Sequence, residues 1–147
     1  MSKTIEELIP HRAPFLFVDE ILSVSNEEII AVKTFENKEN ALLKGSFPGF
    51  NFVPGTILIE SMAQSGGAGV RLLGVTNGVF ALAHIETAQF LKGVEYDMQV
   101  KYIIKNLRLS EKIIKQQGKA YVGDDVVLEA SWMSIRIEAP QTPEETK

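Results

Sequence analysis

The sequence contains no cysteine in its 147 residues. This absence excludes disulfide bridges, zinc sites built from thiolates and a cysteine nucleophile, and it is typical of proteins from a reducing compartment. The chain also lacks an excess of positive charge, with a net charge of −4 and a pI near 5.2. Nucleic-acid binding usually requires a clearly basic surface. We therefore expect no nucleic-acid partner.

Long uninterrupted hydrophobic runs are also missing. The N-terminal stretch MSKTIEELIPHRAPF carries two glutamates and has no unbroken apolar core of the kind found in signal peptides. The longest apolar segment, residues 56–73, is interrupted by Glu60, Gln64 and Arg71. These polar side chains favour a helix in a protein core over a membrane span. We therefore expect a cytoplasmic protein without membrane association.

Length and composition are those of one globular domain, because 147 residues with a hydrophobic fraction of 45% suffice for a single core. We find no internal repeat and no linker that would divide the chain. The sequence predicts a single domain over residues 1–139. The polar tail Pro140–Lys147 contains two prolines, and we expect it to be disordered.

The segment Thr56–Leu73 is predicted to form a helix of 18 residues, about 27 Å long. Pro54 and Gly55 precede it, the Thr56 hydroxyl is a candidate cap, and Gly74 marks its end. Apolar residues occupy more than one face, which indicates a helix surrounded by protein. A helical glycine costs about 1 kcal/mol relative to alanine, so the run of glycines from residue 66 to 69 predicts close packing of another backbone.

Short apolar segments on both sides of this helix predict strands. They are Phe15–Val24, Glu28–Phe35, Val79–Phe90, Met98–Lys105, Ile113–Val122 and Val126–Glu138, the last with a possible bend, while Thr4–Ile9 and Asn37–Asn40 are predicted as short helical turns. Two strands, a long buried helix and then further strands predict an α+β domain. An antiparallel sheet of five to six strands can cover such a helix only by curling around it, which describes a hot-dog fold.

Glu60 and Gln64 are the polar exceptions on the central helix, and at a spacing of four residues they share one face. One interpretation is a satisfied buried hydrogen bond or a face that reaches solvent. The other is a general acid or base held in a cleft.

Two motifs, IPHRAPFLFVDEI and GSFPGFNFVPGTILIESMAQ, resemble those of the (3R)-hydroxyacyl-acyl carrier protein dehydratases of type II fatty acid synthesis. The resemblance covers roughly Ile5 to Glu138. It implies a homodimer whose two sheets join edge to edge, often three dimers in a hexamer, with active sites at the dimer interface. It also implies a phosphopantetheine-linked acyl chain on acyl carrier protein as substrate, and no metal or organic cofactor.

The resemblance also assigns roles to individual residues. Glu60 falls on the family's catalytic carboxylate, and Gly55 supplies the backbone amide at the helix start. Ser46 occupies the position of the catalytic histidine, although serine cannot accept a proton near neutral pH. Phe47, Pro54 and Gln64 are the expected substrate-binding residues.

The chain has only two histidines, His11 and His84. The resemblance makes His11 a structural part of its motif. His84 replaces a family glycine and is either an ordinary strand residue or a relocated base. Gln89-Phe90 and the segment 95–98 also depart from the family pattern, and they leave acyl-chain length and partner docking open.

A basic segment lies between Met98 and Lys119, with six Lys or Arg residues and one Glu. It could steer an acidic acyl carrier protein, or its lysines could protect sheet edges. Three function classes therefore stay open: a hydro-lyase acting on 3-hydroxyacyl thioesters, a thioesterase in which Glu60 activates water, and a non-catalytic paralogue that binds acyl thioesters or assembles with an active dehydratase.

Overall fold

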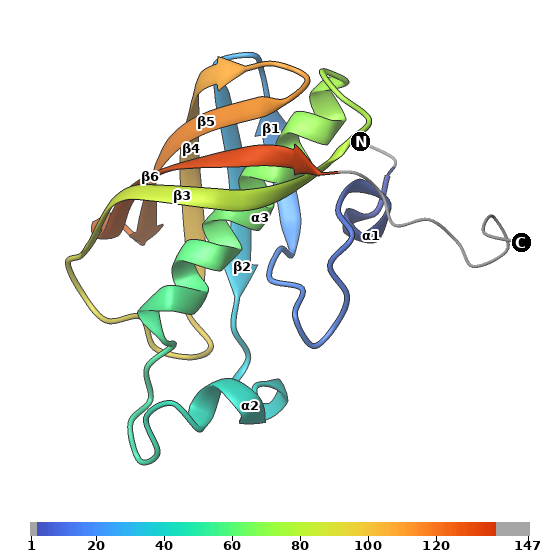
Figure 1. Ribbon diagram of the computed structural model, residues 1–147. Helices are drawn as coiled ribbons and strands as arrows, with labels where there is room; N and C mark the ends of the chain where they lie inside the picture. The colour runs from blue at the N-terminus through green and yellow to red at the C-terminus, as the bar shows by residue number, and fades with distance from the viewer. Residues whose placement is uncertain (1–2, 138–147) are drawn as a thin grey trace, which may run out of the picture.

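The protein folds as one antiparallel sheet wrapped around a single long helix. In the computed structural model, residues 3–137 are described, and the sheet curves so that α3 lies against its concave face (Figure 1). The helical elements are α1 (Ile5–Leu8), the 3-10 turn η1 (Asn37–Glu39), α2 (Ala41–Lys44) and α3 (Gly55–Leu73). The strands are β1 (Glu20–Val24), β2 (Glu28–Thr34), β3 (Val79–Phe90), β4 (Gln99–Leu109), β5 (Ile113–Val122) and β6 (Asp125–Ile137).

The strand order is β1-β2-β4-β5-β6-β3, so β1 and β3 form the two edges. β4, β5 and β6 are joined by antiparallel pairing of consecutive strands, whereas β3 crosses over to pair with β6. This confirms the predicted α+β hot-dog architecture with six strands. The predicted tail, residues 140–147, lies outside the described residues.

The strands β3 and β5 have the predicted bounds, but β1 begins at Glu20 instead of Phe15. The reason lies at Phe17, whose backbone bonds to side chains of α3. Its N–H donates to Gln64 Oε1 at 2.8 Å, and its carbonyl accepts from Ser61 Oγ at 2.6 Å. The segment before β1 is therefore held by the helix.

Irregular pairing marks three of the other strands, β3, β4 and β6. The predicted bend in the last strand corresponds to one extra residue of β6, Val127, opposite Ala120 and Tyr121 of β5. β3 carries two further irregularities in its pairing with β6, at Leu82/His84 and at Ile85/Thr87. Such bulges bend a strand and increase its twist, which helps a sheet to close around a helix.

The start of α3 differs from the prediction in one respect. Pro54 is the N-cap residue, and its carbonyl accepts the N–H groups of Ile57 and Leu58. Thr56 lies inside the first turn, so the predicted capping by its hydroxyl was wrong. The predicted end is confirmed, because Gly74 adopts a left-handed conformation with φ of 78°.

Buried residues occur on several faces of α3, as predicted. The glycines, however, make room for side chains and not for a backbone. A Cβ on Gly69 would lie 2.6 Å from Cδ1 of the fully buried Ile29, and one on Gly66 would overlap the Gln116 amide. Gly118 of β5 in turn makes room for a side chain of the helix, because a Cβ there would lie 2.5 Å from Met62 Sδ. Within residues 3–137, no helix combines the length and apolar character that crossing a membrane requires.

Candidate active site

Glu60 lies in the second turn of α3 and opens into a cavity of about 300 Å³. The helix lines this cavity with residues spaced three or four apart, which places them on one stripe. They are Glu60, Ala63, Gln64, Gly67 and Arg71, and they face residues 8–11 of the N-terminal loop and residues 78–82 at the start of β3. The Glu60 side chain is 22% exposed, so its carboxylate is accessible from the cavity.

Gln64 anchors the Glu60 carboxylate through a hydrogen bond. Its Oε1 accepts the Phe17 N–H at 2.8 Å, so its Nε2 is the atom left to donate to Glu60 Oε1, at 3.0 Å. The Gln64 side chain is only 2% exposed. The interpretation as a satisfied hydrogen bond is therefore confirmed, and the pair also presents a carboxylate to a cavity. The role of Glu60 as a general acid or base stays a prediction.

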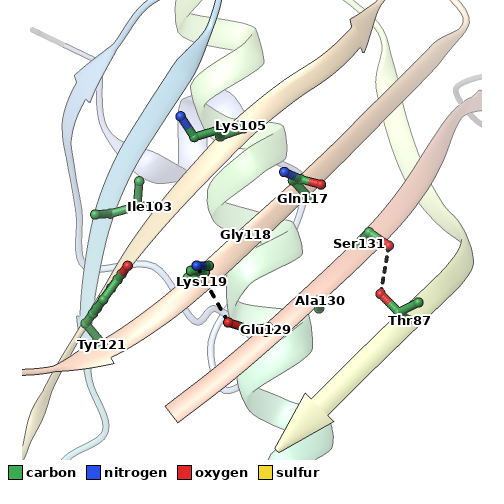
Figure 2. Close-up of a pocket in the computed structure, with 10 residues that line it drawn as sticks. All are labelled: Thr87, Ile103, Lys105, Gln117, Gly118, Lys119, Tyr121, Glu129, Ala130 and Ser131. Carbon is green, nitrogen blue, oxygen red and sulfur yellow. Dashed lines mark hydrogen bonds and ion pairs between the residues drawn. The ribbon is translucent and has the colours of Figure 1, made fainter. Parts of the chain in front are cut away.

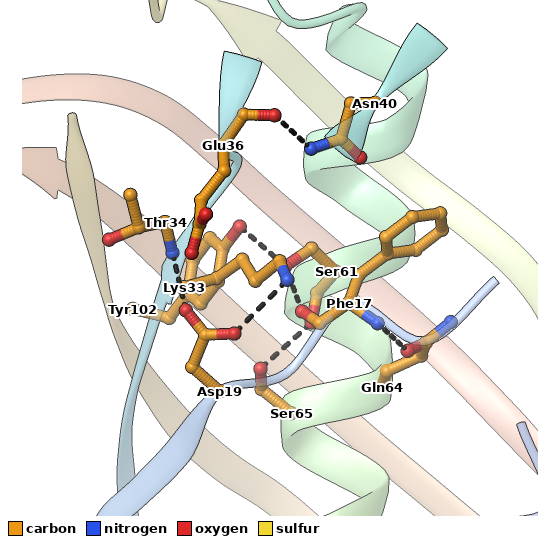
Figure 3. Close-up of polar contacts among 10 residues, drawn as sticks. All are labelled: Phe17, Asp19, Lys33, Thr34, Glu36, Asn40, Ser61, Gln64, Ser65 and Tyr102. Carbon is orange, nitrogen blue, oxygen red and sulfur yellow. Dashed lines mark hydrogen bonds and ion pairs between the residues drawn. The ribbon is translucent and has the colours of Figure 1, made fainter. Parts of the chain in front are cut away.

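A second series of hydrogen bonds holds the segment around Phe17 against α3 (Figure 3). Ser61 Oγ donates to the Phe17 carbonyl and accepts from the Tyr102 hydroxyl at 2.7 Å, and Ser65 Oγ donates to the Ser61 carbonyl at 2.8 Å. Burial raises the pKa of Tyr102, so its hydroxyl stays protonated and acts as a donor. The role of these hydrogen bonds is to fix the Phe17 backbone, and through it Gln64.

The structure places His11 beside Glu60, a contact that the sequence did not predict. His11 Nε2 lies 3.6 Å from Glu60 Oε1, and its side chain is 26% exposed. Burial lowers the pKa of His11, and this effect outweighs the opposing attraction of Glu60. In the sequence, the only feature that distinguishes His11 as a candidate for this contact is its position within the motif IPHRAPF.

The remaining predicted residues gather elsewhere, around a cavity of about 630 Å³ at the start of α3. Ser46, Phe47, Pro54 and Gly55 all line it, together with residues 90–94. Ser46 is exposed. A Cβ on Gly55 would lie 2.6 Å from the ring of the exposed Phe90, so a larger residue here would require that ring to move. Within one chain, the predicted site is therefore divided between two cavities.

Exposed apolar side chains surround this second cavity. Phe47, Phe50, Phe52, Phe90 and Leu91 are 44–63% exposed. The sequence singled out only Phe47 among them, although the run GSFPGFNF contains three of these aromatic residues. Apolar groups clustered in this way mark surfaces that a ligand or a partner covers.

His84 lies on the edge strand β3, where it is exposed and pairs with Met133 of β6. It lines neither of the two cavities. No group of three metal-ligating side chains occurs in residues 3–137.

The basic segment covers β4 and β5 and borders a groove on the outer face of the sheet (Figure 2). Lys119 lies 3.7 Å from Glu129, and Lys105 lies 3.9 Å from Glu28. β4 and β5 are central strands, so these lysines do not protect a sheet edge. Carboxylates on neighbouring strands offset part of their charge.

Comparisons with known proteins place this architecture in a family. The protein-family model described as "ApeP-like: ApeP dehydratase" matches residues 3–109 of the sequence. The chain belongs to this dehydratase family. It is also 37% identical over 131 residues to the 3-hydroxyacyl-[acyl-carrier-protein] dehydratase FabZ of Pelotomaculum thermopropionicum, which covers 88% of this chain and 93% of the relative. A dehydratase-like function and a hydro-lyase reaction class follow from this membership.

Solved structures confirm the fold of this dehydratase-family chain. The dehydratase heterocomplex ApeI:P from Xenorhabdus doucetiae matches with a TM-score of 0.74 and 16% identity, covering 94% of this chain and 93% of that one. A hypothetical thioesterase from Streptococcus pneumoniae, solved with coenzyme A, matches with a TM-score of 0.61 and 15% identity, covering 83% and 88%. At these identities the likeness concerns the fold alone.

Proposed function

We propose that this chain removes water from 3-hydroxyacyl thioesters carried by acyl carrier protein, giving trans-2-enoyl thioesters, with Glu60 as its catalytic residue. The main support is the geometry of Glu60, whose carboxylate is anchored by Gln64 and opens into a cavity. Membership of the dehydratase family supplies the reaction class. The absence of cysteine supports our placing this reaction in the cytoplasm.

The elimination requires two proton transfers. The C2–H bond breaks and its proton passes to a base, while the C3–O bond breaks and the departing hydroxyl takes up a proton to leave as water. Ser46 cannot serve as the base, so the Glu60 carboxylate takes the C2 proton and then returns it to the hydroxyl. Glu60 ends in its starting state, and no other co-reactant is consumed.

Negative charge develops on the thioester oxygen when C2 loses its proton. The first amide of α3, at Gly55, is the donor that we assign to this oxygen, because N–H groups at a helix start are free and the helix dipole favours negative charge there. Phe47 and Pro54 line the same cavity and would pack against the acyl or pantetheine chain. These are the roles that the sequence assigned to them.

We further propose that the complete site forms between two subunits, with Ser46 and Gly55 from one chain and Glu60 from the other. Ser46 and Glu60 line separate cavities in a single chain, and the cavity at Gly55 is surrounded by exposed aromatic side chains. A homodimer, or a trimer of such dimers, would bring the two sets together and cover that apolar surface.

The test is mass spectrometry of the purified protein with 3-hydroxyacyl and enoyl thioesters of acyl carrier protein. A dehydratase interconverts the two substrates by loss or gain of water. Release of free acid would instead identify a thioesterase, a function that the fold likeness to the thioesterase structure permits. No conversion of either substrate would contradict both activities.

The exposure of Ser46 favours a second candidate, assembly with an active dehydratase. No histidine lines the cavity that contains Ser46, so a homodimer would hold Glu60 without an imidazole opposite it. A partner subunit carrying a histidine at this position would complete the site around Glu60. The similar fold of a dehydratase heterocomplex is consistent with such pairing. Activity that appears only after mixing with a second dehydratase would identify this function.

A further inference from the structure

The contacts of Glu60 with its neighbours are unequal for its two oxygens. Gln64 Nε2 donates to Oε1 at 3.0 Å, and His11 Nε2 lies 3.6 Å from the same atom. Within residues 3–137, Oε2 has no hydrogen-bond or ion-pair partner. One oxygen is therefore held and the other is available to a ligand in the cavity.

The surroundings of its two ring nitrogens determine which one carries the hydrogen in neutral His11. Nδ1 is buried and has no hydrogen-bond partner in the described part of the chain. Because Nδ1 is unsatisfied in either tautomer, the surroundings of Nε2 decide: a lone pair there would face the negative Glu60 oxygen, whereas a hydrogen there is attracted to it. The favoured form is a neutral ring with its hydrogen on Nε2, directed at Glu60.

The charged groups around His11 are consistent with a neutral ring. Glu60 attracts a proton to it, whereas burial and the adjacent Arg12 oppose protonation, and burial is the largest effect. Arg71 is the other charged side chain that lines the cavity. The ring is also fixed sterically, because it stacks with Phe15 at a centroid distance of 6.4 Å and an interplanar angle of 21°.

We propose that His11 is a positioning residue that donates from Nε2 to Glu60 Oε1 and so directs Oε2 of the carboxylate at the substrate. This inference deepens the proposed function and rests on it for the reaction itself. The observed 3.6 Å exceeds a hydrogen bond, which for N–H···O spans about 2.7–3.2 Å. Catalytic hydrogen bonds are often long without a ligand and tighten in the complex, and this contact shortens when substrate fills the cavity.

Three variants separate a donor role from simple packing. His11→Gln keeps a neutral N–H near the position of Nε2, His11→Phe keeps the ring and its stacking, and His11→Ala removes both. We expect His11→Gln to retain most of the dehydration rate, whereas His11→Phe and His11→Ala lose roughly 10- to 100-fold in kcat with little change in KM, because a misdirected carboxylate reacts poorly. An active His11→Phe with an impaired His11→Gln would overturn the proposal.

A second measurement does not depend on activity. The only other histidine is His84, which is exposed, so nitrogen-detected NMR of the full chain resolves two rings. We expect His11 to be the neutral Nε2–H form at pH 7, and its pKa to fall further in Glu60→Gln, because the carboxylate raises it. The NMR signals of the distant His84 ring serve as an internal reference. A His11 signal that does not respond to Glu60→Gln would overturn the contact. If the NMR response is present but no dehydration is found, the proposed function fails and the contact stands.

Discussion

Ile29 of β2 lies against Gly69 of α3 so closely that a Cβ built on the glycine would come within 2.6 Å of the isoleucine Cδ1. Ile29 is fully buried. At Gly67, on the cavity side of the same helix, the nearest atom to a Cβ is Ile9 Cγ2 at 4.0 Å. The two glycines therefore have different reasons to be present.

Alanine substitutions should distinguish them. We expect Gly69→Ala to lower the free energy of unfolding by about 1–3 kcal/mol, because overpacking forces the core apart. Gly67→Ala should raise it by up to about 1 kcal/mol through helix propensity alone. Denaturant unfolding of the two variants measures both effects. Equal destabilisation would show that Gly67 is also tightly packed.

Removal of the Glu60 charge should abolish turnover and leave the fold intact. Glu60→Gln keeps the side-chain shape, and its amide oxygen can still accept from Gln64, so we expect an unfolding midpoint near that of the wild type. Activity should fall by about 10²-fold or more, because the proton-transfer group is lost. Glu27→Gln makes the same chemical change at an exposed turn and serves as the control. Unchanged turnover in Glu60→Gln would make Glu60 a structural residue.

Restoring an imidazole at position 46 should increase dehydration. Ser46→His places a base in the cavity that already contains Gly55 and Phe47, and general acid–base catalysis typically contributes ~10²–10⁴-fold. Ser23→His, at an exposed position of β1, is the matched control. The initial rate with 3-hydroxyacyl thioesters is the measurement. If His84 is instead a relocated base, the wild type is already fast, His84→Ala silences it, and Ser46→His adds little.

Assembly depends on the edge strand β3 if the subunits join edge to edge, as the resemblance implies. Residues 83–87 of β3 are exposed, and Ile85 is 44% exposed. We expect light scattering at micromolar concentration to show a dimer or a hexamer. Ile85→Glu should dissociate it, because a charge would be buried at the junction. Leu22→Glu on the opposite edge, where Leu22 is also 44% exposed, should not. A wild-type monomer would exclude a site shared between subunits.

The lowered pKa of His11 predicts a specific loss of stability in acid. The unfolded chain binds a proton at His11 near the ordinary value of 6.5, whereas the folded chain binds it only at lower pH. The free energy of unfolding of the wild type, measured relative to His11→Gln, should therefore be constant above neutral pH and decline as the pH falls below about 6.5. Denaturant titrations at a series of pH values provide this difference. A rise toward low pH would mean that protonation of His11 is favoured by folding.

Much of the fold could be predicted because its signals are local. The bounds of β3 and β5 follow from apolar patterns and from turn residues, and the end of α3 follows from Gly74. The contact of His11 with Glu60 joins residues 49 positions apart, and no pattern near either residue encodes it. The late start of β1, at Glu20 instead of Phe15, has the same cause, since the partners of Phe17 lie on a helix distant in the sequence.

The candidate site was predictable in identity but not in arrangement. Glu60 and Gln64 are recognisable as polar residues on an apolar helix, and the structure confirms that they share a face and a hydrogen bond. Which cavity Ser46 enters depends on the path of the loop before α3, and sequence spacing does not determine that path. The functional roles of all the predicted site residues stay predictions, namely those of Glu60, Ser46, Gly55, His84, Phe47, Pro54 and Gln64.

The rotation of α3 is set by residues other than those assigned to the chemistry. Ser61 is bonded to the Phe17 carbonyl and to Tyr102, and Gln116 of β5 donates to the Gly66 carbonyl at 3.3 Å. These hydrogen bonds therefore orient position 60 toward its cavity, and they do not involve the side chain at that position. A chain of this kind can lose or regain its reaction through one or two substitutions while keeping the surfaces by which it associates. Duplicated copies can then diverge into active and silent subunits that still assemble with one another.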